Sequence, residues 1–174
     1  MGEVESTSGH LLIATPNMGD ENFDMTIVFI VEHTSDGALG VVVNRPTETP
    51  VGTHLPDLAP LVSPPDVFFI GGPVSPDHVI GVGRDGEAIS MIDLDGVIEG
   101  RVERPDGLRL FAGYSGWAPG QLDGELAAGA WFVVEAFDGD VFGPNPPELW
   151  REVLKRQGGK LGRLSLYPDD PILN

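Results

Sequence analysis

Apolar residues in this chain fall in short runs instead of long periodic stretches. Short runs of β-branched and aromatic residues, separated by glycine- and proline-containing turns, are typical of β-strands. The turn at Ser35-Asp36-Gly37 lies between two such runs and predicts a β-hairpin. The predicted strands are residues 10–15, 25–33, 39–44, 67–70, 79–82, 88–92, 108–112 and 130–137.

Helical spacing of apolar residues is found in a few segments only. The best predicted helix is 146–157, with Asn145 as N-cap and Gly158 as its stop. Residues 121–128 predict a short helix, and 53–62 a weak one that its prolines limit. Many strands with a few interspersed helices, without regular strand–helix alternation, predict an α+β fold.

The chain is predicted to be one domain. It has 174 residues, and its 24 glycines and 16 prolines are spread along the chain instead of forming a linker. We take residues 1–174 as the domain, with the polar residues 1–8 as a flexible tail.

Composition excludes several kinds of site. The chain has no cysteine, which excludes disulfides, thiolate metal sites and cysteine nucleophiles. No window approaches the ~18 apolar residues that span a bilayer, and the polar, acidic N-terminus does not resemble a signal peptide. We therefore expect a cytoplasmic protein without membrane association.

The net charge of −17 bears on possible partners. DNA and anionic membranes attract proteins through Lys and Arg, so direct nucleic-acid binding is not expected. A basic cluster near the end of the chain is either a small anion site or a set of cations that offsets a helix C-terminus. Its members are Arg151, Lys155, Arg156, Lys160 and Arg163.

Two candidate ligand positions lie at predicted strand ends. Asn44 and Arg45 close the second strand of the hairpin, where Pro46 favours an extended arginine. Such an arginine presents its guanidinium to a carboxylate or phosphate, or forms an ion pair within the protein. Gly71 and Gly72 follow another strand, where they allow either close approach of a ligand or a tight turn.

A third candidate is the loop that leads into the helix at 121–128. Trp117 lies in this loop, and Gln121 and Glu125 share one face of the helix, where they could orient a polar ligand. Ordinary helix capping and packing is the alternative.

Catalytic and metal sites find little support in the sequence. Ser115 lacks the glycine two residues later that a nucleophile elbow requires, because Trp117 stands there. The four histidines have no metal-ligand spacing, and the acidic pairs at 93–95, 138–140 and 169–170 are interpreted as turns. We expect no cofactor and no metal.

Several of these blocks together resemble the YqgE/AlgH family of bacterial proteins. They are Gly9–Pro16, Gly37–Pro46, Gly71–Val74, Gly113–Leu122 with Glu125, Gly129–Trp131 and Leu149–Trp150. The resemblance covers essentially the whole chain. It implies an α+β fold whose bent mixed or antiparallel sheets form a pseudo-barrel with a few flanking helices. Family members are often labelled transcriptional regulators but have no recognised DNA-binding motif.

We therefore predict a non-enzymatic binding or regulatory protein that acts on transcription indirectly. Its ligand would be a small anion, a nucleotide-like metabolite or a peptide segment of a protein partner. Its predicted groove combines the three candidate positions. A hydrolase-like enzyme with Glu125 or an aspartate as base is the alternative. The groove residues are Asn44, Arg45, Gly71, Gly72, Trp117, Gln121 and Glu125.

Overall fold

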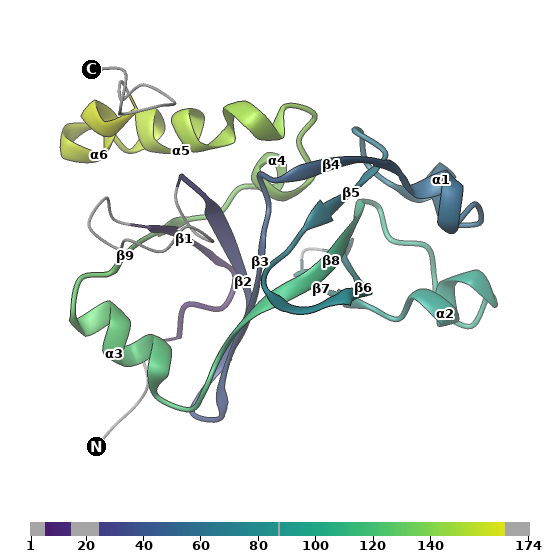
Figure 1. Cartoon of the computed structure of the whole chain (residues 1–174), viewed down its shortest axis with the longest axis horizontal. Coiled ribbons are helices and arrows are strands. Elements are labelled where there is room, and N and C mark those ends of the chain that lie inside the picture. The colour runs from purple at the N-terminus through teal and green to yellow at the C-terminus, as the bar shows by residue number, and fades with distance from the viewer. Residues whose placement is uncertain (1–5, 15–24, 87, 166–174) are drawn as a thin grey trace.

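The computed structural model describes residues 6–14, 25–86 and 88–165 (Figure 1). The strands are β1 (His10–Ala14), β2 (Ile27–Thr34), β3 (Gly37–Val42), β4 (Pro46–Pro50), β5 (Val67–Ile70), β6 (Val74–Asp85), β7 (Ala88–Ile92), β8 (Leu108–Trp117) and β9 (Trp131–Glu135). The α-helices are α1 (Val51–His54), α2 (Leu94–Ile98), α3 (Gln121–Ala127), α4 (Asp138–Phe142), α5 (Leu149–Gln157) and α6 (Gly159–Leu164). Two 3₁₀ turns are η1 (Ala59–Leu61) and η2 (Pro146–Glu148).

Strand β8 joins the two halves of the sheet. Its first part pairs with β5 in parallel and with β6 in antiparallel, and its last residues pair with β3 in antiparallel. The main strand order is β4-β5-β8-β3-β2-β1-β9, with β7 attached through β6. This confirms the predicted α+β fold with a mixed sheet. The sheet is not closed into a barrel, because β4 and β9 lie at opposite ends of the order among the described strands.

A glycine allows β8 to pass from one half of the sheet to the other. Gly113 has φ +74°, a left-handed conformation that other residues rarely adopt. The register with β6 jumps here, from the pair Val74–Tyr114 to the pair Val79–Ala112. A Cβ at Gly113 would lie 2.6 Å from the carbonyl oxygen of Gly72, so the neighbouring strands also require glycine.

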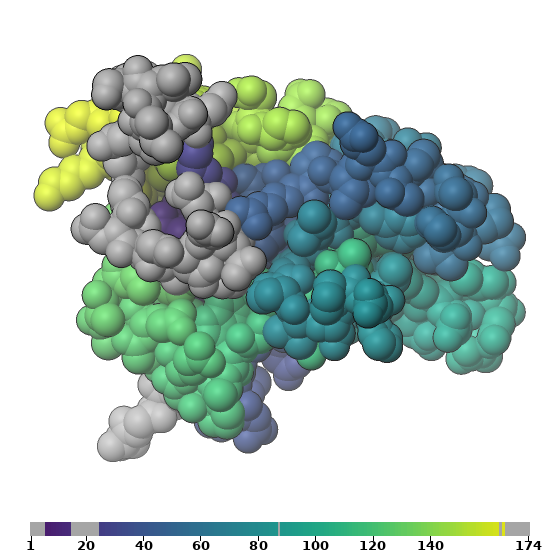
Figure 2. Space-filling view, in the orientation of Figure 1, coloured from purple at the N-terminus to yellow at the C-terminus, as the bar shows by residue number. Residues whose placement is uncertain are grey.

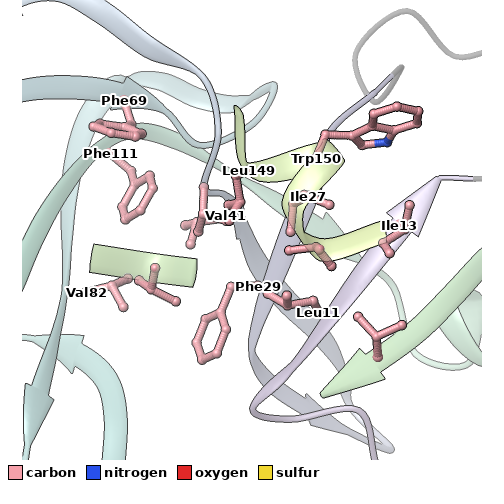
Figure 3. Close-up of a cluster of buried hydrophobic side chains, with 14 of the residues drawn as sticks. Leu11, Ile13, Ile27, Phe29, Val41, Phe69, Val82, Phe111, Leu149 and Trp150 are labelled. Carbon is pink, nitrogen blue, oxygen red and sulfur yellow. The ribbon is translucent and has the colours of Figure 1, made fainter. Parts of the chain in front are cut away.

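The sheet carries one core on one face and two on the other. On the first face, strand residues such as Phe29 and Phe111 pack against the apolar side of α5, which includes Leu149 and Trp150 (Figure 3). On the second face, α3 covers a core around Val42 and Leu122. A third core, formed by β5, β8, α1 and α2, lies farther along that face.

All eight predicted strands and the β2–β3 hairpin are present. β4 was missed because it begins and ends with proline, which favours a turn prediction. It is an edge strand that bonds only to β5, with irregular register, and an edge strand tolerates proline. The weak helix at 53–62 is instead α1 followed by η1.

The predicted helix at 146–157 begins as the 3₁₀ turn η2 and continues as α5, which ends at Gly158 as predicted. Asn145 holds the N-cap position of η2, as predicted, but its side chain makes no capping bond. The acidic pairs at 93–95 and 138–140, interpreted as turns, belong to the starts of α2 and α4. The Asp93 side chain caps α2, and Asp140 accepts the Phe137 N–H at the start of α4. The pair at 169–170 lies outside the described residues.

A buried arginine connects β8 to two distant loops. Arg109 is 1% exposed, and its guanidinium donates to the carbonyl oxygens of Val141, Gly143, Ser63 and Pro64 at 2.6–3.1 Å. It also lies 4.4 Å from the centre of the Phe69 ring. Burial lowers the pKa of Arg109 to about 10, so the side chain remains charged at neutral pH. Backbone carbonyls and an aromatic ring face therefore stabilise the charge of Arg109 in place of water. Among the described residues, no carboxylate contacts it.

Replacing Arg109 by methionine should destabilise the fold by roughly 3 kcal/mol, because buried carbonyls would lose their donors. Arg104→Met, at an exposed position nearby in the sequence, should change stability by less than about 0.5 kcal/mol. Urea unfolding of both variants measures the difference. Equal stability of the two variants would show that the fold does not depend on the hydrogen bonds from Arg109 to the four carbonyl oxygens.

Candidate functional site

The predicted site residues around α3 converge on one carboxylate. Glu125 Oε1 accepts the indole N–H groups of Trp117 at 3.0 Å and Trp131 at 2.8 Å. Glu125 Oε2 accepts the side-chain N–H of Gln121 at 3.0 Å. Trp117 and Trp131 also pack edge to face, with ring centres 6.1 Å apart. The structure therefore brings Trp117, Gln121 and Glu125 together, and adds Trp131.

These bonds attach α3 to the sheet. The Gln121 side chain also accepts the backbone N–H of Ala118 at 3.0 Å, which ties the loop to the helix. Leu122, from the same helix, is buried in the core beneath. Glu125 uses both carboxylate oxygens in internal bonds, so this cluster is arranged to position the helix. Trp131, at the start of β9, was not among the predicted site residues. It has no sequence spacing to Glu125 that distinguishes it from other apolar strand residues.

A second polar cluster joins the N-terminal segment, β2 and α3, around the buried His33. His33 is 4% exposed, and its Nε2 lies 3.1 Å from Asp123 Oδ1, although not aligned for a hydrogen bond. Its Nδ1 accepts the backbone N–H of Thr7 at 3.0 Å and lies 2.9 Å from the Thr7 hydroxyl oxygen.

This order of hydroxyl, imidazole and carboxylate resembles a nucleophile–base–acid series. Thr7 is only 4% exposed, however, and its own amide occupies the imidazole nitrogen that would accept the hydroxyl proton. The cluster therefore joins the N-terminal segment to β2 and α3. Residues 1–5 of the predicted tail lie outside the described residues, whereas Thr7 is part of the packed structure.

The other predicted site residues lie at the far end of β3. The Asn44 side chain accepts the Ile27 N–H at 2.9 Å and donates to the Met25 carbonyl at 3.0 Å, so it holds the start of β2. The backbone carbonyl of Arg45 accepts the Ile70 N–H at 2.9 Å. This bond places Arg45 beside the end of β5.

Gly71 and Gly72 are packed against β8 and are buried. The Gly71 N–H donates to the Ala112 carbonyl, and its own carbonyl accepts the Val42 N–H and the Ser115 hydroxyl. A Cβ at Gly71 would lie 2.3 Å from the Gly113 carbonyl oxygen. The backbone of Gly71 is thus used by the sheet, and the Ser115 hydroxyl is buried against it.

The seven predicted groove residues form two groups. Trp117 pairs with Ala38 near the start of β3, whereas Arg45 follows the other end of that strand. The seven residue steps from 38 to 45 span roughly 23 Å at about 3.3 Å per residue. The structure therefore does not place the two groups around one pocket.

An exposed apolar row lies beside Arg45. Ile70 of β5 and Val79 of β6 both pair with Ala112 of β8, so the three side chains project from one face of the sheet. Ile70 is 46% exposed and Val79 is 38% exposed. The segments that carry Arg45 and this row lie side by side in Figure 2, coloured blue and teal. The sequence did not indicate this row, because exposure depends on which helices cover that face.

Metal-ligand clusters and membrane-spanning helices are both absent from the described parts of the chain. No three His, Cys, Asp or Glu side chains gather there as metal ligands would. None of the helices described there has the length and apolarity needed to cross a membrane.

Comparisons with known proteins agree over the whole chain. Residues 11–162 match a family described as AlgH-like. A UPF0301 protein of Streptomyces coelicolor is 48% identical, and the match covers 100% of this chain and 98% of the relative. A UPF0301 protein of Thermobifida fusca is 40% identical, with 97% and 96% of the two chains covered.

Two solved structures share the fold. The crystal structure of protein DIP2367 from Corynebacterium diphtheriae has a TM-score of 0.84 and 31% identity, covering 96% of this chain and 95% of that one. The solution structure of the AlgH protein from Pseudomonas aeruginosa has a TM-score of 0.69 and 29% identity, covering 98% of each chain.

Glu125→Ala should destabilise the protein by about 2 kcal/mol, because two partly buried indole N–H groups and Gln121 would lose their acceptor. Glu135→Ala, at an exposed position on the neighbouring strand, is the matched control and should cost less than about 0.5 kcal/mol. Chemical denaturation followed by tryptophan fluorescence measures both. An unchanged unfolding midpoint for Glu125→Ala would contradict the positioning role.

Gly71→Ala should cost roughly 2 kcal/mol, because the added methyl group would collide with backbone atoms of β8. Gly124→Ala, inside α3 where a Cβ meets nothing within 4 Å, should instead stabilise the helix by up to about 1 kcal/mol. Thermal unfolding of the two variants should therefore shift in opposite directions. A Gly71→Ala variant as stable as the unmodified protein would show that β5 and β8 leave room for a methyl group at this position.

Proposed function

The chain belongs to the AlgH-like family, and we propose that it is a non-enzymatic binding protein that recognises a peptide segment of a partner protein. The observation that carries the proposal is the exposed apolar row of Ile70, Ala112 and Val79 next to Arg45. Apolar side chains that lie together on an open sheet face mark interaction surfaces more often than single exposed residues do.

The dimensions of the row favour a peptide. Ile70 and Val79 lie on strands that flank β8, so they are two strand spacings apart, or about 10 Å. One small apolar group would contact only part of this width, whereas two side chains of a peptide would cover it. Arg45 lies at the β5 side of the row and already has a partner within the protein, so the apolar side chains supply the proposed contact.

In this proposal the remaining predicted groove residues do not contact the peptide but position the strands and the helix around the surface. Gly71 and Gly72 hold the end of β5 against β8, and Asn44 holds the segment that leads to Arg45. Trp117, Gln121 and Glu125 position α3 at the other end of β3. An influence on transcription would in this proposal pass through the bound partner, because a net charge of −17 opposes direct contact with DNA.

Selection from a displayed peptide library tests the proposal, with the purified protein as target and Ile70→Asp as the variant. Selected peptides should bind Ile70→Asp at least tenfold more weakly, about 1.4 kcal/mol, because an added carboxylate would lie in the apolar row. Met91→Asp is the matched control, since Met91 is equally exposed at 46% on β7. Its affinity should change by less than about twofold.

Failure to select any binding peptide would overturn the proposal. It would also fail if both aspartate variants lost affinity equally, because added negative charge would then explain the loss. Thermal unfolding of each variant establishes that the fold is intact before affinities are compared.

A further inference from the structure

We propose a second binding site, for a small organic phosphate, between α5 and α6 on the opposite face of the sheet. It is independent of the peptide-binding row. The two helices enclose an open cavity of about 590 Å³, whose charged lining includes Arg151, Lys155, Arg163, Glu148 and Glu152. Ligand pockets in proteins usually have volumes of ~300–1,000 Å³.

The amphipathic pattern of α5 explains why charged side chains face the cavity. Leu149, Trp150, Val153 and Leu154 are buried against the sheet, which leaves the opposite side of the helix away from the core. Glu148, Glu152 and Lys155 follow one another at spacings of three and four residues on that side. On α6, Gly159, Gly162 and Arg163 face them.

Gly162 lies at the contact between the two helices. Its ideal Cβ position would lie 3.8 Å from the backbone carbonyl oxygens of Leu154 and Lys155, so α6 approaches α5 closely at this point. The cavity opens beside this contact, where the glycines of α6 present no side chains. The cavity between α5 and α6 is therefore left open by side chains that are absent from the glycine positions of α6.

The cations in this region have two different roles. Arg156 forms two bonds to the buried Asp140 carboxylate, at 3.0 and 2.8 Å, and stacks 4.1 Å from the Phe137 ring centre. Arg156 therefore holds α5 to α4. Lys155 and Arg163 are exposed, and neither forms an ion pair within the described residues. The proposed site relies on these two, because Arg151 already has a partner.

The basic residues of the chain are concentrated in this region, although the chain as a whole is acidic. Five of its 10 basic residues lie between positions 151 and 163, in a protein whose net charge is −17. Long polyanions such as nucleic acids would meet the acidic remainder of the surface, whereas a small anion would contact the cationic cluster alone.

The carboxylates that line the cavity restrict which anions could bind there. Glu148 and Glu152 would repel a bare phosphate but accept hydrogen bonds from hydroxyl or amino groups. A ligand that satisfies both kinds of side chain carries a phosphate at one end and hydroxyl or amino donors at the other. Sugar phosphates and mononucleotides have this chemistry.

Isothermal titration with inorganic phosphate, ribose 5-phosphate and AMP tests the site. We expect saturable binding of at least one organic phosphate, tighter than that of inorganic phosphate. The double variant Lys155→Gln with Arg163→Gln should weaken it at least tenfold, about 1.4 kcal/mol, since it removes both cations that would donate charge-assisted hydrogen bonds to the phosphate.

The matched control removes the same two charges elsewhere. Arg101→Gln with Arg104→Gln, both exposed and outside the cavity lining, should change the affinity by less than about twofold. Glu152→Gln should reduce the preference for organic over inorganic phosphate, because it removes the charge that repels a bare phosphate and leaves one acceptor oxygen in place of two.

No saturable binding of any probe would overturn the proposal, and so would equal weakening in the two double variants. If the Lys155/Arg163 variant unfolds, Lys155→Gln alone is tested, since this exposed side chain has no bond in the described fold that it could break. Peptide selection on the apolar row uses a different surface, so either proposal can fail while the other stands.

Discussion

The buried guanidinium of Arg109 is the constraint on which the arrangement of the sheet depends. It lies on β8, the strand that both halves of the sheet share, and it donates to carbonyls of the segment before β5 and of the C-terminal end of α4 with the residue that follows it. Transferring a cation from water into a protein interior costs several kcal/mol unless polar groups replace the water. Four carbonyl oxygens and the Phe69 ring replace it here, so these loops cannot move away from β8 without exposing or desolvating a charge.

The second constraint is the close approach of backbones around Gly71, Gly72 and Gly113. At each of these positions a Cβ would collide with backbone atoms of a neighbouring strand. Because close-packed interiors tolerate little added volume, these glycines fix how β5, β6 and β8 meet. That junction is also what brings Ile70 and Val79 to the two sides of Ala112. The proposed peptide surface is thus a consequence of the glycines that the sequence indicated. The backbone of Gly71 itself is occupied by bonds to Ala112, Val42 and Ser115.

The sequence predicted the strands well and the site only in part, for physical reasons. Runs such as 25–33 predict strands because β-branched residues favour extended backbone and pack well on one or both faces of a sheet. The helix α6 was missed because Gly158 and Gly159 indicate a stop, and they do end α5 before a new helix begins. Gln121 and Glu125 could be paired from helical spacing, but Trp131 joins them only through tertiary contact between α3 and β9. Arg109 could not be predicted at all, because its partners are backbone carbonyls, which every residue has.

The net negative charge of the chain is compatible with the proposed anion site, because most of the acidic side chains lie too far from the cavity to act on an anion inside it. At physiological ionic strength the Debye length is about 8 Å, so exposed charges farther away are largely screened. The cube root of the cavity volume is also about 8 Å, so a phosphate inside would interact mainly with Lys155, Arg163 and the carboxylates beside them. The 27 acidic residues then act chiefly on large polyanions, which extend beyond the cavity over the rest of the surface. A strongly acidic protein can therefore select a small phosphate while it repels nucleic acids, provided that cations such as Lys155 and Arg163 line one cavity, as they do between α5 and α6.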